Sequence, residues 1–113
     1  VVEIDTANWK VKRTMKMEGQ PVRLQLLPGE KQMLVSLIVD GAMAVVDLGT
    51  GKEVKRLDVG LNAEGMHIDP ASGEGFVSAQ GAKRIVRFSL QTLERTGTLE
   101  TAERPDPILV WRP

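Results

Sequence analysis

Residues 24–38, LQLLPGEKQMLVSLI, and residues 66–80, MHIDPASGEGFVSAQ, decide the fold, because the second stretch is a diverged copy of the first. Three identities recur at one spacing of 42 residues: Pro28 with Pro70, Val35 with Val77, and Ser36 with Ser78. A constant spacing at independent positions indicates an internal repeat, which has to be recognised before any other feature is interpreted.

The repeat extends outward in both directions. Matching apolar positions at the same spacing cover most of residues 21–112, including Leu48 with Leu90, Leu57 with Leu99, Met66 with Ile108, and Ile68 with Val110. Near the N-terminus the best matches have slightly larger spacings: residues 1–4 align with 45–48, and residues 11–13 with 54–56. This drift predicts small turn insertions, with Trp9 in one of them.

Each repeat contains four short strands separated by turn residues, without a sustained helical period. The predicted first strands are Val22–Leu26, Gly65–Ile68 and Pro107–Val110; the second strands are Gln32–Leu37 and Gly75–Ala79; the third are Ala44–Leu48 and Ile85–Leu90; the fourth are Glu53–Val59 and Arg95–Leu99. Proline and glycine mark the turns, because proline presets φ and glycine accepts a positive φ.

Four short antiparallel strands in roughly 40 residues form the blade of a β-propeller, in which successive sheets stack around a central channel. We therefore predict an all-β chain of four-stranded antiparallel blades, present as a partial set. The predicted parts are residues 1–20, the third and fourth strands of one blade; 21–62 and 63–104, two complete blades; and 105–113, the first strand of the next blade. Such a set leaves blade faces open, which favours a fragment of a longer propeller over self-assembling copies and predicts the remaining blades as partners.

The segments Val45–Val54 and Phe76–Gly81 resemble the YVTN-type propeller repeat, with its V-x-V-I-D-x-x-T-G-x-V stretch and Y-V-A-N hallmark. Pro21 and Pro105 match the family's proline before the innermost strand, whereas Ala63 departs from it. The resemblance implies about seven blades in a complete ring and an exported, periplasmic or extracellular bacterial or archaeal protein. It specifies a fold to which different members attach different functions.

Composition excludes several classes of partner. Fifteen basic residues balance fifteen acidic ones, so the chain lacks the positive charge typical of a nucleic-acid binder. The longest apolar run, residues 33–39, is far shorter than the roughly 20 residues needed to span a membrane as a helix. Cysteine is absent, which excludes disulfides and thiolate sites. Gly49-Thr50-Gly51-Lys52 is interpreted as a hairpin turn, because Val46 and Glu53 break the phosphate-loop pattern.

His67 is the only histidine and lies between Met66 and Ile68 in a predicted first strand, so its side chain should point to the opposite face from theirs. First strands line the channel of a propeller, and some propellers related to the YVTN family carry haem or metal ligands there. Gln25 and Leu109 occupy the equivalent positions, which favours a packed or solvated strand residue.

Charged residues at the start of the first strands are the other candidates for ligand binding. Glu64 and its equivalent Asp106 could bind a cation or an amine from adjacent blades, although acidic turn residues often serve solubility alone. Arg23, with Arg104 and Glu103 nearby, could bind an anionic ligand or simply hydrate the rim.

Two functions fit this inventory. The leading hypothesis is a non-catalytic propeller scaffold that binds a protein or a small molecule through its channel-mouth loops, without a cofactor or metal. The alternative is an enzyme or redox domain, lactonase-like or haem-carrying, whose site includes His67, Glu64 or Asp106 together with residues of other blades.

Overall fold

The computed structural model describes all 113 residues and is built almost entirely from antiparallel strands. The strands are β1 (Val2–Asp5), β2 (Lys10–Thr14), β3 (Pro21–Leu26), β4 (Gln32–Leu37), β5 (Ala42–Asp47), β6 (Lys52–Asp58), β7 (Ala63–Asp69), β8 (Glu74–Ala79), β9 (Arg84–Ser89) and β10 (Arg95–Glu100). A single 3₁₀ turn, η1 (Gln80–Ala82), connects β8 to β9.

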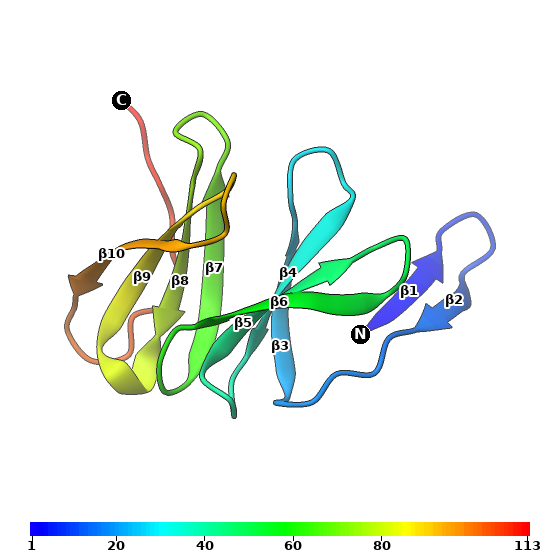
Figure 1. The fold of residues 1–113 in the computed structure, drawn as a ribbon, viewed down its shortest axis with the longest axis horizontal. Helices are drawn as coiled ribbons and strands as arrows, with labels where there is room; N and C mark the ends of the chain where they lie inside the picture. The colour runs from blue at the N-terminus through cyan, green and yellow to red at the C-terminus, as the bar shows by residue number, and fades with distance from the viewer.

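The strands form two four-stranded sheets and one hairpin. The first blade has the order β3-β4-β5-β6, the second blade the order β7-β8-β9-β10, and β1 pairs only with β2 in the N-terminal hairpin. Figure 1 shows the three units side by side, with the hairpin and the C-terminal end on opposite sides of the molecule. The predicted fold class, a partial set of antiparallel propeller blades, is confirmed.

The cores lie between the units because side chains alternate across each strand. On β4, Leu34 packs into a cluster shared with the second blade, whereas Met33, Val35 and Leu37 pack into a cluster shared with the chain that follows the hairpin. Both faces of the first blade are therefore apolar, which explains why β4 and β5 have no exposed residue.

The turn between the third and fourth strands repeats at one spacing throughout the chain. Its last residue has a positive φ in all three copies, at Trp9 (58°), Gly51 (70°) and Leu93 (56°), and these residues lie 42 apart. The register of the adjacent strands also skips one residue at the same place in each copy, at positions 12, 54 and 96.

The predicted insertions near Trp9 are therefore wrong. The hairpin aligns with the later repeats at 42 residues, and Lys12 is the equivalent of Val54. The larger spacings came from matching similar apolar and basic residues that lie one or two positions out of structural register, because the bulge itself is at the same place in every copy.

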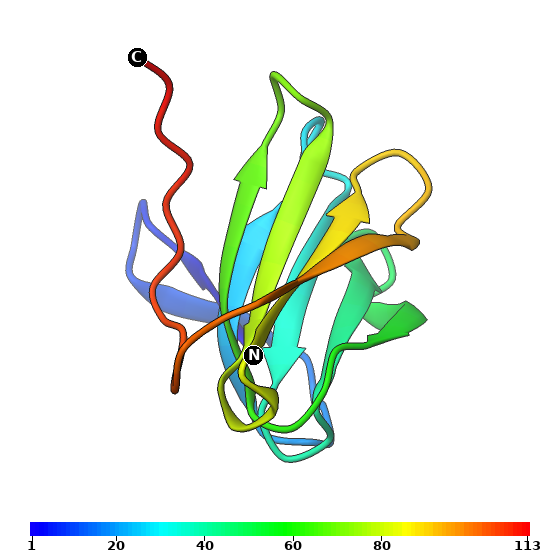
Figure 2. The same cartoon turned by 90° about the vertical axis from the view of Figure 1, so that its left-hand side faces the viewer.

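At Pro107–Val110, which the sequence predicts as the first strand of the next blade, no strand is assigned within these 113 residues, and the membership of a next blade stays a prediction. Residues 101–113, the C-terminal segment, contain no assigned strand and extend along β7 without joining its sheet (Figure 2). A strand needs a hydrogen-bonded neighbour, and no other segment lies in position to pair with these residues.

Candidate functional site

A bulge lies at the start of each first strand, and in β7 it positions the candidate carboxylate Glu64. The register of β7 against β8 shifts between Ala63 and Met66, and that of β3 against β4 shifts between Pro21 and Arg23. Bulges of this kind bend the strand and re-aim a side chain. Glu64 thereby leaves the sheet ladder and reaches the first strand of the neighbouring blade.

Two of the predicted site residues meet across the blade junction. Arg23 Nη2 lies 3.5 Å from Glu64 Oε1, with the Arg23 side chain 56% exposed and that of Glu64 20% exposed. Arg23 also donates from Nη1 to the Val22 carbonyl at 3.1 Å. Because the Arg23 side chain is open to solvent and the two charged atoms are 3.5 Å apart, the pair contributes at most about 1 kcal/mol to stability. It leaves guanidinium donors of Arg23 accessible at this end of the first strands.

Asp106 lies at the equivalent place on the next junction, against the backbone of Gly65. A Cβ built on Gly65 would be 1.9 Å from Asp106 Oδ1, so only glycine leaves room for this carboxylate. The Gly65 amide donates to Ser78 Oγ at 2.9 Å. At the first junction Arg23 stands where Gly65 stands, and the buried hydroxyl of Ser36, the equivalent of Ser78, has no hydrogen-bond partner.

His67 is not joined to these charges. Its ring is half-buried, lies opposite Phe76 in the register of β7 and β8, and makes no hydrogen bond or ion pair. Met66 and Ile68 pack against the core between the blades, whereas His67 does not belong to that core. Its use as a ligand stays a prediction.

A polar depression of about 340 Å³ lies at the same end of the second blade, and we call it the rim pocket. It is lined without any apolar residue by Asn62, Gln80, Gly81, Lys83, Glu103 and Arg104. Lys83 Nζ and Glu103 Oε1 form an ion pair of 3.0 Å across it. Glu64 and Asp106 each follow a lining residue by two positions, so the rim pocket and the carboxylates belong to one surface.

A larger groove of about 670 Å³ lies at the opposite end of the blades, between the turns at residues 27–32, 70–74 and 89–96. It contains none of the four predicted site residues. Since the rim is where charged side chains from two blades and the C-terminal segment converge, the candidate site is placed at the rim.

A second cross-segment pair was missed by the sequence analysis. Arg112 of the C-terminal segment forms an ion pair with the buried carboxylate of Asp69, which also accepts from Ser72 Oγ at 2.7 Å. The hydrogen bond from Ser72, and then Arg112, hold the pKa of Asp69 below its ordinary value. No sequence signal links residues 43 positions apart in this way, whereas the recurrence of Ser36 and Ser78 could have pointed to the junction hydroxyls.

The structure contains no group of three or more His, Cys, Asp or Glu side chains arranged to hold a metal ion. None of its helical segments has the length and apolar character needed to cross a membrane.

Comparison with known proteins supports the fold. Among solved structures, the chain is similar to hydrazine synthase from Kuenenia stuttgartiensis, with a TM-score of 0.80 and 21% identity over 89% of this chain and 29% of that one. It is also similar to AztD from Citrobacter koseri (TM-score 0.73, 14% identity, 92% and 30% of the two chains). A third similar structure is the β-propeller domain of Cps50 (Swd1) from Myceliophteria thermophila (0.67, 14%, 80% and 28%).

These neighbours are β-propeller proteins, so the chain has a β-propeller fold. It spans less than a third of the length of each. No family model and no curated protein matches the sequence.

Proposed function

We propose that this chain is part of a non-catalytic propeller scaffold that binds a protein or a small polar molecule at the rim formed by Arg23, Glu64, the rim pocket and Asp106. The single observation that carries the proposal is the convergence of these polar and charged groups, from two first strands, the η1 turn and the C-terminal segment, on one end of the blades. Their side chains are accessible and contribute little to stability, as expected of groups that serve a ligand.

The arrangement favours a ligand with both polar and charged groups. Arg23 offers guanidinium donors and pairs with Glu64. Asp106, at the place equivalent to Glu64, has no such cationic partner, because Gly65 stands in the position of Arg23. A ligand that presents an amine towards Asp106 and an acceptor towards Arg23 or Arg104 would match this pattern of charge.

The test is a nuclear magnetic resonance titration of the ¹⁵N-labelled chain with a panel of amino acids, short peptides and polyamines. We expect at least one member of the panel to shift the amides of residues 61–65, 80–83, 103, 104 and 106 together. Glu64→Gln combined with Arg104→Ala should weaken that binding at least tenfold, since both remove charge without altering the core.

Lys31→Ala, at the opposite end of the blades, is the matched control and should leave binding within twofold of the unmodified chain. Ligands that shift only residues around Pro28 and Pro70 would place the site elsewhere and refute the proposal. A visible haem or metal absorbance that disappears in His67→Ala would do the same, in favour of the redox alternative.

The YVTN-type resemblance and an exported, periplasmic or extracellular location are part of the same proposal. They are supported by the residues of Val45–Val54 and Phe76–Gly81, which carry the resemblance.

A further inference from the structure

Strand β1, at the N-terminus, has one unpaired edge. Its equivalents β5 and β9 each pair on both sides, with β4 and β6 and with β8 and β10, whereas β1 pairs with β2 alone. Val1 exchanges two backbone hydrogen bonds with Met15, of 2.8 and 2.9 Å. Because successive residues of a strand alternate in direction, the backbone groups of Val2 and Ile4 point away from β2, towards the open edge.

An apolar groove follows this edge. A depression of about 720 Å³ lies between β1 and the first blade, and a second of about 270 Å³ continues it; together we call them the β1 groove. Apolar residues form much of its wall, namely Val1, Val2, Met15, Leu24, Leu26 and Met33. Exposed apolar surface next to an unpaired strand edge is a typical binding surface for another strand.

The repeat supplies an internal comparison for what covers this groove. Leu24 and Leu26 of β3 are 53% and 42% exposed, whereas their equivalents Met66 and Ile68 of β7 are partly buried against the core between the blades. The residues that help to form that core from the preceding blade include Leu34, on a second strand. The N-terminal hairpin contains the equivalents of a third and a fourth strand only, so no second strand covers Leu24 and Leu26.

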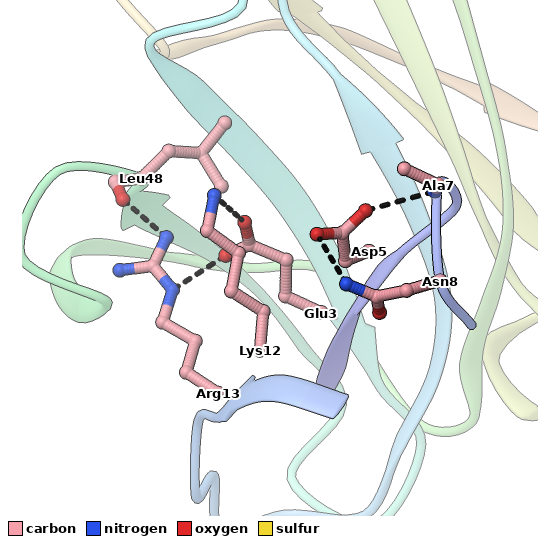
Figure 3. Close-up of polar contacts among 7 residues, drawn as sticks. All are labelled: Glu3, Asp5, Ala7, Asn8, Lys12, Arg13 and Leu48. Carbon is pink, nitrogen blue, oxygen red and sulfur yellow. Dashed lines mark hydrogen bonds and ion pairs between the residues drawn. The ribbon is translucent and has the colours of Figure 1, made fainter. Parts of the chain in front are cut away.

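Side-chain contacts join the two strands of the hairpin and attach it to the first blade. Glu3 forms ion pairs with Lys12 at 3.1 Å and with Arg13 at 2.6 Å, and Arg13 also donates to the Leu48 carbonyl of the first blade (Figure 3). Asp5 accepts from the amide of Ala7 at 2.8 Å and from the Asn8 side chain at 3.2 Å, which fixes the turn. These contacts join β1 to β2 and to the first blade and leave its outer edge free.

We infer that the β1 edge and the β1 groove together bind a two-stranded β-hairpin from outside these 113 residues, which supplies the first and second strands that the N-terminal hairpin lacks. Its second strand pairs antiparallel with β1 through Val2 and Ile4. Its side chains that face the groove are apolar, because the equivalent residues Leu34 and Phe76 are leucine and phenylalanine.

The probe for this interaction is a synthetic peptide of residues 19–40, which contains a first and a second strand of the same repeat. Fluorescence anisotropy of the labelled peptide measures binding to the 113-residue chain, and hydrogen exchange followed by nuclear magnetic resonance measures protection of Val2 and Ile4. We expect saturable binding and at least tenfold slower exchange of both amides. A peptide carrying Leu34→Lys should bind at least tenfold more weakly.

Leu24→Lys combined with Leu26→Lys should abolish binding, because it puts two charges in the groove. Val54→Lys is the matched control: Val54 is 57% exposed on β6, outside the groove, and its substitution should leave binding within twofold. Circular dichroism establishes that both variants remain folded.

Three results would overturn the inference. They are absence of binding at millimolar peptide, equal binding by the Leu24→Lys/Leu26→Lys variant, and amides of Val2 and Ile4 that are already protected in a dimer of the chain. The last would assign the edge to a second copy.

Discussion

Asp69 has the most distinctive environment of any single carboxylate in the chain. It is 9% exposed, is the last residue of β7, and accepts from the hydroxyl of Ser72 and the guanidinium of Arg112. Its backbone carbonyl accepts from the Gly73 amide at 3.0 Å, which closes the turn into β8. One side chain thus connects a local turn to the C-terminal segment.

This environment predicts a dependence of stability on pH. The pKa of Asp69 is lowered on folding, first by Ser72 and then by Arg112, so the folded state binds this proton less readily than the unfolded chain. The contribution is present at neutral pH and is lost as pH falls below about 4, the ordinary aspartate value, and through the lowered pKa. When the pH is lowered from about 6 to about 3, the melting temperature of Asp69→Asn should therefore fall less than that of the unmodified chain.

Asp58→Asn is the control for this measurement by scanning calorimetry, since Asp58 is exposed and its side chain makes no ion pair. Its melting temperature should follow that of the unmodified chain across the same range. Parallel curves for all three proteins would contradict the assigned role of Asp69.

At the scale of the strand, the two blades fill an equivalent pair of positions with side chains of opposite relative size. Met33 of β4 pairs in register with Val46 of β5, and the equivalents in the second blade are Gly75 and Phe88. A Cβ on Gly75 would lie 2.2 Å from Phe88 Cζ, so the large ring occupies the space that the absent side chain leaves.

Exchanging the side-chain sizes at positions 75 and 88 predicts that the two substitutions are energetically coupled. Gly75→Met should destabilise the fold by about 3 kcal/mol through overpacking, and Phe88→Val by about 2 kcal/mol through a cavity. The double variant recreates the pair of the first blade, so its loss should be smaller than the sum by at least about 1 kcal/mol.

Urea denaturation of the four proteins measures this difference. Gly75→Met combined with Val35→Ala, a residue of the other core cluster, is the matched control and should be additive. Additivity of Gly75→Met and Phe88→Val would show that the two positions do not share one volume.

For the whole molecule, the surface between the blades determines cooperativity. Its core contains Leu34, Met43 and Val45 from the first blade and Val77 and Phe88 from the second. Arg84 reinforces it from the second blade, donating from Nε and Nη2 to the Val59 carbonyl at 3.0 and 2.7 Å. Neither blade buries its apolar face without the other, as expected for a stacked repeat.

Leu34→Ala should therefore weaken both blades at once. We expect a loss of about 3 kcal/mol, because Leu34 is fully buried, with a single unfolding transition. Leu24→Ala, on an exposed side chain, should cost under about 1 kcal/mol.

Nuclear magnetic resonance signals from β5 and β9, followed in urea, report the two blades separately. Coincident midpoints in both variants are expected. A first blade that unfolds before the second in Leu34→Ala would mean that the interface couples them weakly.

The sequence alone determined the repeat of 42 residues, the four-stranded blade, and the positions of strands β3 to β10, because strand alternation and turn residues act over a few neighbouring positions. It wrongly placed an insertion at Trp9, because the positive φ of this turn position carries no sequence signal in a bulky residue. The strand predicted at Pro107–Val110 has no neighbour to pair with among these residues and stays a prediction.

Only the tertiary structure decided which residues meet. Arg23 reaches Glu64, Asp106 packs on Gly65, and Arg112 pairs with Asp69 because a bulge re-aims the first strand and the C-terminal segment lies along β7. The open edge of β1 likewise became visible only beside β5 and β9, which are paired on both sides. These relations depend on how successive sheets stack, and stacking is set by contacts between residues distant in the chain, which a local pattern does not encode.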